Sequence, residues 1–309
     1  MAIPVVNDLA RIADYNDLRT QVANILGTGA GTSGYGQILN SIQIPPGRLV
    51  SASDWEKLRF DILSILLHQE GVTPNLISVL EGSVIRAATT EAPKIYTDAV
   101  ANIGINKFNI AAGQFVTESK GSVLRTWDST TSPTTWRVSA TASVTVTFAT
   151  TDAARHFFNS GGKIRFSSAR SGGASTSQNT SWTSLLNTAG TQSFGSDAPA
   201  VNFYTLTNTD QFWYTVSASS PYSTNRFRLS ARCDITNNVN GGARILTFTA
   251  LWEDRYDDPG PPAPGDAVDG KIELFASQIR PVGGLYPNLI PASFSIDTPL
   301  YNFGQITGS

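Results

Sequence analysis

The chain has 309 residues, of which 40% are hydrophobic and only 15% are charged, and its formal net charge is −2. This charged fraction lies well below the roughly 25% of typical soluble domains. Because the net charge is small, we expect no overall field that attracts nucleic acid or an anionic membrane. Because Cys233 is the single cysteine, an internal disulfide is excluded. No uninterrupted apolar run reaches the length of a membrane-spanning helix, which is about 18 residues.

The first predicted helix begins near the N-terminus, which lacks the basic and apolar segments of a signal peptide and so indicates synthesis in a cytoplasm. Asp14 is the expected N-cap, because a short carboxylate accepts hydrogen bonds from the free backbone N–H groups of a first turn. Leu18, Val22 and Ile25 recur at the spacing of one helical face, and Gly27 is the expected end of the helix.

A longer helix is predicted to follow, with Ser53 and Glu56 as a capping box at its start and Gly71 at its end. Its apolar side chains cover more than one face: Leu58, Phe60, Ile62, Leu63, Ile65, Leu66 and Leu67. A helix of this kind is buried on two sides, so we expect a homo-oligomer in which a second subunit contacts it. Trp55 is accordingly a candidate residue of the interaction surface.

The segment between these helices is rich in glycine and ends at Pro45 and Pro46. Within it, residues 29–34 read G-x-G-x-x-G, the pattern of dinucleotide-binding loops. Because the segment follows a helix and not a strand, we interpret it as an ordered linker. A weaker helix is predicted at residues 78–88, and residues 1–105 together form the predicted N-terminal helical domain, which serves attachment or oligomerisation.

Residues 106–309 are predicted to form a β-rich domain, since β-branched and aromatic residues alternate there with polar ones. The expected strands are residues 134–150, 163–169, 201–206, 212–218, 224–234, 243–254 and 271–279. Two short helices are inserted among them, at residues 151–162 and 179–190, the second capped by Asn179 or Thr180 and ended by Gly190. The predicted fold class is therefore α+β, with a helical N-terminal segment followed by an antiparallel, sandwich-like domain.

A Gly-Gly pair precedes one predicted strand and raises the question of phosphate binding. Gly162 and Lys163 match the end of a P-loop, but Phe157 stands where that motif needs its first glycine and Ile164 where it needs Ser or Thr. The order of helix, turn and strand is also the reverse of the motif's strand, loop and helix. We therefore expect Gly161 or Gly162 to end the helix with a positive φ, and no nucleotide to bind.

No set of residues matches an active site, so the chain is predicted not to be an enzyme and to need no cofactor or metal. His68 and His156 lie beside apolar residues on predicted helices and fit structural roles, and Cys233 fits a small buried hydrophobe. A Pro/Gly loop at about residues 255–270 is surrounded by Asp254, Asp257, Asp258, Asp266 and Asp269. Their spacing matches no EF-hand, which favours a solvated acidic loop over a Ca²⁺ site.

Two groups of side chains are candidates for an interaction surface on the β-rich domain. The predicted strand 224–234 places Phe227, Leu229, Ala231 and Cys233 on one face, and Arg226, Arg228, Ser230 and Arg232 on the other. The three arginines could meet a phosphate or sulfate, but such a face is more often exposed to solvent or paired with carboxylates of a neighbouring strand. The aromatic side chains Phe212, Trp213, Tyr214, Tyr222 and Trp252 suit a sugar-stacking patch or, at lower cost, packing in the core and between subunits.

Three segments carry a resemblance to a known class of proteins: DYNDLRTQVANILGTGAGTSGYGQ, SDWEKLRFDILSILLHQEG and ARHFFNSGGKIRFSSARSGGASTSQNTSWTSLLNTAG. In this order they resemble virion structural proteins of tailed bacteriophages, most closely those of marine and cyanobacterial myoviruses. The resemblance implies a particle component of the tail, neck or baseplate that contacts other virion proteins and assembles in the host cytoplasm. It also implies use as a trimer or hexamer, because tailed particles have threefold and sixfold axes.

Three other functions remain as alternatives at this point. A host-binding fibre or adhesin module would use the aromatic residues or the acidic loop to contact a surface glycan. A capsid decoration protein would be present in hundreds of copies per particle. A glycosidase would need two opposed carboxylic acids, and no such pair stands out in the sequence.

Overall fold

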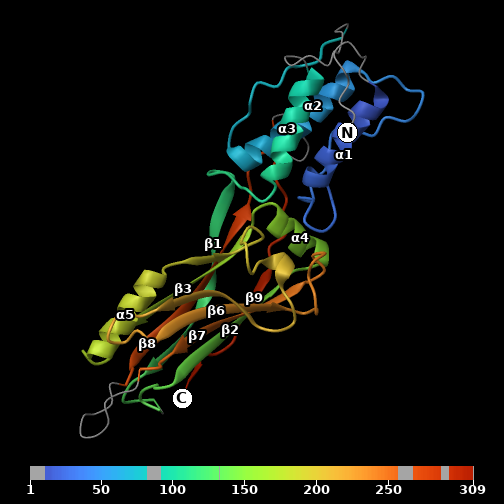
Figure 1. The fold of residues 1–309 in the computed structure, drawn as a ribbon. Coiled ribbons are helices and arrows are strands. Elements are labelled where there is room, and N and C mark those ends of the chain that lie inside the picture. Colours follow the sequence, from blue (N-terminus) through green and yellow to red (C-terminus); the bar gives the residue numbers. More distant parts are fainter. Residues whose placement is uncertain (1–10, 82–91, 132, 257–266, 287–291, 309) are drawn as a thin grey trace. The chain divides into compact units, whose positions relative to one another are not determined.

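The computed structural model describes residues 11–81, 92–131, 133–256, 267–286 and 292–308, and Figure 1 shows their secondary structure. The fold is α+β with an N-terminal helical segment and two antiparallel sheets, which confirms the predicted class. No helix among these residues is both long and apolar enough to cross a membrane.

The chain folds into two compact units. Each unit is assembled from three segments that are separate in the sequence. Unit 1 comprises Met1–Val116, Asp152–Gly162 and Arg280–Asp297. Unit 2 comprises Thr117–Thr151, Lys163–Ile279 and Thr298–Ser309. The predicted division into residues 1–105 and 106–309 misses the two later segments of unit 1, because contacts between segments distant in sequence leave no periodic pattern in either.

Unit 1 contains α1 (Ile12–Leu26), α2 (Ala52–Glu70) and α3 (Ala92–Ile105), which pack against one another. The predicted N-cap of α1 is wrong: Arg11 is the N-cap, and the Asp14 carboxylate in the first turn accepts a hydrogen bond of 2.9 Å from the Arg11 N–H. Gly27 ends this helix as predicted.

The predicted capping box of α2 is also wrong. Ser51 is the N-cap, its hydroxyl accepts from the Asp54 N–H at 3.2 Å, and the Asp54 carboxylate accepts from the Ser51 N–H at 2.9 Å. This pair has the same spacing as the predicted one, and its carboxylate gains a salt bridge of 2.9 Å with Arg48. Gly71 ends α2 in the left-handed conformation, with φ of 73°, as predicted.

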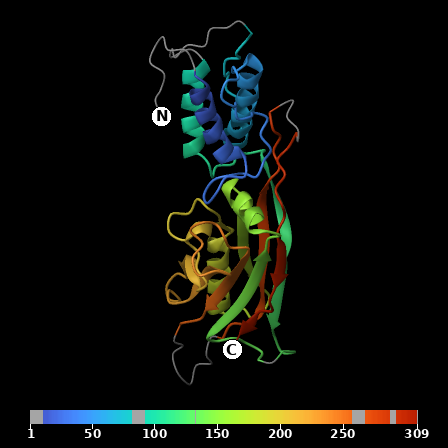
Figure 2. The same ribbon diagram turned by 90° about the vertical axis from the view of Figure 1, so that its right-hand side faces the viewer.

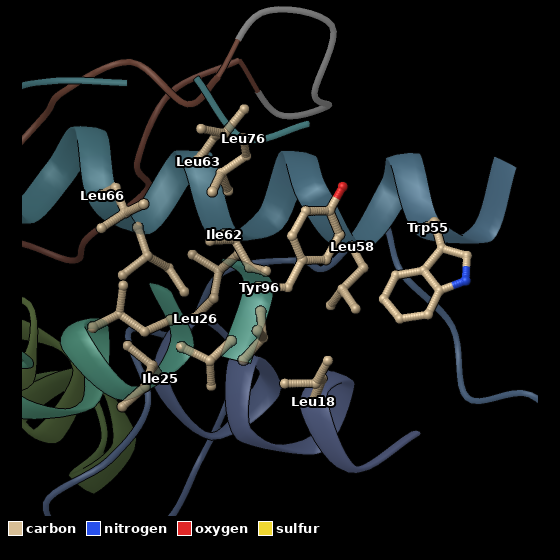
Figure 3. Packing of buried hydrophobic residues seen from close by; sticks show 14 of the residues in the cluster. Leu18, Ile25, Leu26, Trp55, Leu58, Ile62, Leu63, Leu66, Leu76 and Tyr96 are labelled. Atoms are coloured by element: carbon tan, nitrogen blue, oxygen red, sulfur yellow. The ribbon is translucent and has the colours of Figure 1, made fainter. Parts of the chain in front are cut away.

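The helices of unit 1 share one apolar core, part of which is shown in Figure 3. Its buried members are Tyr15, Leu18, Val22, Ile25, Leu26, Tyr35, Ile44, Trp55, Leu58, Ile62, Leu63, Ile65, Leu66, Leu76, Val79, Tyr96, Val100, Ile103, Leu285 and Phe294. The apolar faces of α2 are therefore covered within the same chain, so the width of its apolar surface is no evidence for a second subunit.

Helix α3 is a helix that the sequence prediction missed. The weaker predicted helix at 78–88 is not helical over residues 78–81, and its remainder lies outside the described residues. The aromatic ring of Tyr96 lies 5.6 Å from that of Trp55, so α3 supplies the second packing partner that α2 needs.

Helix α4 (Thr151–Asn159) binds the glycine-rich linker of unit 1. The Asn159 side-chain amide donates to the carbonyls of Gly31 and Gly34, each at 3.2 Å, and Arg155 donates to the Ser33 carbonyl at 2.7 Å. The G-x-G-x-x-G pattern thus forms a loop whose carbonyls hold a helix of the same chain, which agrees with its interpretation as an ordered linker.

Unit 2 is built on two sheets, seen from a second direction in Figure 2. The four-stranded sheet has the order β1 (Phe115–Trp127), β8 (Gly270–Pro281), β3 (Lys163–Ser171), β4 (Gln192–Phe194). The other sheet has the order β10 (Thr307–Gly308), β2 (Ser139–Thr147), β7 (Ile245–Glu253), β6 (Arg226–Cys233), β5 (Gln211–Ser217), and β9 (Leu300–Phe303) also pairs with β2.

The two sheets face each other across a second apolar core. The rings of Phe166 on β3 and Phe248 on β7 lie 5.0 Å apart, and the Trp252 indole donates to the Ser168 hydroxyl at 3.1 Å. Strand β2 alternates strictly between buried and half-buried residues, the pattern of one face on a core and one toward solvent. The sandwich-like expectation is thereby supported.

Several details of unit 2 differ from the prediction. Residues 203–205 form a single 3₁₀ turn and not a strand, while β1, β4, β9 and β10 were not predicted. Helix α5 (Ser177–Ala189) has Thr176 as its N-cap and not Asn179 or Thr180. Strands β9 and β10 hold the C-terminal segment along β2 of the same chain.

Candidate interaction surfaces

Helix α5 presents an outer face that is polar but carries no charge. The Thr176 hydroxyl accepts from the Asn179 N–H at 3.1 Å and fixes the start of the helix. Trp182, Leu185 and Leu186 face the core of unit 2. The exposed side chains are Ser177, Thr180, Ser184, Asn187 and Thr188. Such a face can be covered by a partner without the cost of desolvating a charge.

Two depressions lie along this helix and share part of their lining. The larger has a volume of about 700 Å³ and is lined by Arg170, Gly172, Gly173, Ala174, Ser175, Asn179, Thr180, Thr183, Ser184, Asn187 and Thr188. The smaller has a volume of about 280 Å³ and extends from α5 to residues 217–222. Thr180, Ser184 and Thr188 line both, so one row of hydroxyl groups separates the two depressions.

The wall of the larger depression is fixed by Asp269. Its carboxylate accepts from the Ala174 N–H at 3.0 Å and from the Asn179 amide at 2.5 Å, and its carbonyl accepts from Arg170 at 2.6 Å. Burial lowers the pKa of the Arg170 guanidinium, and the nearby Asp269 carboxylate partly offsets this effect. The turn between Arg170 and Ala174 relies on Gly172 and Gly173, which adopt φ of 69° and 78°.

The three arginines of the predicted surface share one face of β6, as expected, but they are not a free anion site. The Arg228 guanidinium carbon lies 3.3 Å from the centre of the Phe212 ring, and its Nη1 lies 3.6 Å from a Glu253 carboxylate oxygen. Arg226 is half-buried and Arg232 is exposed. Arg228 thus pairs with a carboxylate of the neighbouring strand β7, as expected, and also contacts an aromatic ring, which was not predicted.

The predicted aromatic residues do not form one sugar-stacking patch. Trp55 belongs to unit 1 and is only 1% exposed, so its assignment to an interaction surface is wrong. Trp213 contacts the rings of Phe194 and Tyr214, and Tyr222 packs against Tyr256 with ring centres 4.6 Å apart. Both side chains therefore pack within the chain, although Tyr222 also borders the smaller depression.

The residues considered for catalysis have structural surroundings. His68 is fully buried, His156 is in contact with the Thr28 carbonyl at 3.0 Å, and burial raises the pKa of the Cys233 thiol, which disfavours a thiolate. Lys163 forms a salt bridge of 2.5 Å with Asp197. No group of three or more His, Cys, Asp or Glu side chains that could hold a metal occurs among the described residues.

The acidic loop is described only in part, because Asp257, Asp258 and Asp266 lie outside the described residues. The carboxylates of the other two acidic residues, Asp254 and Asp269, accept hydrogen bonds from groups of the same chain. The Asp254 carboxylate accepts from the Gln178 amide at 2.6 Å, and Asp269 holds the turn beside α5.

No protein-family model, curated protein or solved structure matches the chain. The interpretation of function therefore depends on the surfaces of the molecule and on the resemblance seen in its sequence.

The α5 face was missed at the sequence level, although a signal for it is present. In residues 177–188, the polar positions 177, 180, 181, 184, 187 and 188 recur at helical spacing, and none of them is charged. A polar face without charge is uncommon on a solvated helix, and it could have been noted as a contact surface.

Proposed function

We propose that the chain is a structural component of a tailed bacteriophage particle, located in the tail, neck or baseplate, and that it acts through contacts with other virion proteins. The resemblance of the first 190 residues suggests this role. The observation that carries it is the chemistry of two surfaces of unit 2 that are rich in uncharged polar side chains.

The first of these surfaces is the α5 face. The second is the outer face of β2 and β7, where small hydroxyl side chains share the surface with Leu251 and Glu253 and border Arg232 of β6: Ser139, Thr141, Ser143, Thr145, Thr147, Thr247 and Thr249. Thr145 pairs with Thr247 and Ser143 with Thr249 across the two strands. Thr and Ser on the face of a sheet offer hydrogen bonds at a low cost in side-chain entropy, which suits contacts repeated between many subunits.

We propose assembly as a trimer or hexamer in the virion, the symmetry being the one that the resemblance implies. Light scattering of the purified chain tests self-association. Thr247→Lys on the sheet face and Thr180→Lys on α5 each place a charge in one of the two surfaces. We expect at least one of these two variants to form a smaller fraction of oligomer than the wild type. A monomeric wild type that is also absent from labelled images of purified particles contradicts the proposal.

A second candidate function, binding of a host surface glycan, is favoured by the two depressions along α5. Their linings offer hydroxyl and amide groups, the partners that sugar hydroxyls require. A glycan array with the wild type, Thr180→Val and Ser184→Ala tests it, with Thr236→Val on an exposed turn as the control. We expect binding about tenfold weaker for each α5 variant and unchanged for the control.

Capsid decoration is distinguished by imaging particles in which this protein is labelled. Counting the labels per particle separates a tail, neck or baseplate position from decoration, which requires hundreds of copies.

A further inference from the structure

Four polar side chains meet between the two sheets of unit 2, and none of them belongs to the surfaces described above. Glu118 and Lys120 come from β1, Gln278 from β8 and Tyr301 from β9. One carboxylate oxygen of Glu118, Oε2, accepts from the Lys120 ammonium at 2.9 Å and from the Gln278 amide nitrogen at 2.8 Å. The Tyr301 hydroxyl donates to the Gln278 amide oxygen at 3.1 Å.

The strands place these groups on the inner side of the sheets. On β8, Ile272, Leu274 and Ala276 point into the core, and Gln278 continues this row with no exposed surface. On β1, Gly121 has φ of 114° and directly follows Lys120. After it, Ser122 bonds to Glu273, whose side chain lies on the opposite face of β8 from Gln278. The break in alternation at Gly121 therefore leaves Glu118 and Lys120 directed toward Gln278.

This set contains every part that an acyl transfer needs. The Lys120 nitrogen and the Gln278 amide nitrogen both donate to the same Glu118 oxygen, so one carboxylate brings the amine and the amide into a single hydrogen-bonded group. The Glu118 carboxylate contacts both nitrogens and can carry a proton from one to the other. Burial and the Glu118 carboxylate raise the pKa of Tyr301, which keeps its hydroxyl protonated and able to donate to the carbonyl oxygen.

We propose that Lys120 and Gln278 become joined by an intramolecular isopeptide bond, which the folded chain forms by itself. The cluster is then a modification site, and its product is a covalent link between β1, at one edge of the four-stranded sheet, and the adjacent strand β8. The link closes a long stretch of chain, and links of this kind stabilise a fold mainly by restricting its unfolded state.

The reaction balances without a cofactor or an oxidant. Glu118 takes a proton from the Lys120 ammonium, and the amine nitrogen attacks the Gln278 amide carbon Cδ. Negative charge develops on Oε1, where Tyr301 donates its hydrogen bond. The bond from Cδ to Nε2 then breaks, the attacking nitrogen loses its remaining excess proton through Glu118, and Nε2 leaves as ammonium. Glu118 ends ionised, as it began, and no group is oxidised or reduced.

The mass of the intact, denatured wild-type chain tests the proposal directly. We expect it to be lower than the mass calculated from the sequence by one ammonia molecule. Trypsin then releases a branched peptide in which residues 108–125 are joined to residues 272–309, with Lys120 uncleaved and with cleavage after Arg280 blocked by Pro281. An intact mass equal to the calculated one, together with cleavage after Lys120, overturns the proposal.

Two variants separate the roles of the residues. Lys120→Arg keeps the positive charge beside Glu118 but removes the amine, and Glu118→Gln keeps a hydrogen-bonding side chain but removes the proton carrier. We expect the full calculated mass for both, measured against a wild type with the same N-terminal processing. A mass deficit that persists in Lys120→Arg shows that the ammonia comes from another site and contradicts the assignment. If neither variant folds, the wild-type mass and branched peptide still decide.

Discussion

The imidazole Nε2 of His68, near the end of α2, lies 2.9 Å from the carbonyl oxygen of Ser160, which follows α4, and so links two distant segments of unit 1. Since a carbonyl oxygen only accepts, Nε2 carries the proton. The ring is fully buried and stacks on Phe294 with ring centres 4.3 Å apart, and its Nδ1 has no hydrogen-bond partner among the described residues. A second proton on Nδ1 would leave a buried charge with an unsatisfied donor.

We expect stability to fall as the pH is lowered from about 6.5 to about 4. Burial lowers the pKa of His68 to about 4, whereas in the unfolded chain it is near 6.5, so the unfolded state binds the proton first. The loss contributed by His68 is about 3 kcal/mol and is complete below pH 4. Urea unfolding across this range measures it. His68→Gln, which cannot titrate, should lack this component, and equal slopes in the two proteins would argue against it.

Asp61 provides a second test of a buried polar group. It has no exposed surface, and its carboxylate accepts four hydrogen bonds from Asn40 and Ser41, two from each residue, at 2.6–3.0 Å. Asp61→Ala leaves these donors without partners in the interior, so we expect a loss of about 3 kcal/mol in the free energy of unfolding. Asp17→Ala, at an exposed position of α1, is the control and should change it by less than about 0.5 kcal/mol.

How far the sequence predicts this fold differs between elements for physical reasons. Strong local signals worked: Gly71, Gly161 and Gly190 end helices as predicted, because each adopts a positive φ that favours glycine. Trp55 was misplaced because an apolar pattern shows that a face is buried but not what covers it, and the cover, α3, was not recognised. Strands β9 and β10 are too short to show alternation, and they form because β2 offers an unpaired edge.

The candidate sites were less predictable than the fold. The arginines of β6 were correctly placed on one face, but the contact of Arg228 with Phe212 depends on the pairing of β5 with β6, which no local pattern specifies. The cluster at Gln278 was missed for the same reason, since its members are distant in sequence. Glu118 and Lys120 lie on β1, a strand that was not predicted, so no part of the cluster was identified beforehand.

Nucleotide binding is expected to be absent. Lys163, which follows the Gly-Gly pair, is held by Asp197 at 2.5 Å and begins a strand, so it does not face a phosphate-binding loop. Calorimetric titration of the wild type with Mg-ATP and Mg-GTP should show no heat of binding. An affinity in the micromolar range that disappears in Lys163→Ala would reverse this conclusion.

The last prediction concerns the two glycines after α4. Gly161 adopts φ of 83°, and a Cβ there would lie 2.9 Å from the Ile110 Cβ. A Cβ on Gly162 would lie 2.5 Å from the Phe157 carbonyl oxygen. We expect Gly161→Val to lower the free energy of unfolding by about 3 kcal/mol, from the positive φ and the contact together, and Gly162→Val to be destabilising through the contact alone.

Gly113 offers a matched control, because its φ is 85° and no heavy atom lies within 4 Å of the position of an added Cβ. Gly113→Val therefore carries the conformational cost of about 1–2 kcal/mol without the steric one. Urea unfolding of the three variants separates the two contributions. If Gly161→Val costs no more than Gly113→Val, the close packing of Ile110 against this turn does not restrict position 161, and only the backbone conformation requires glycine there.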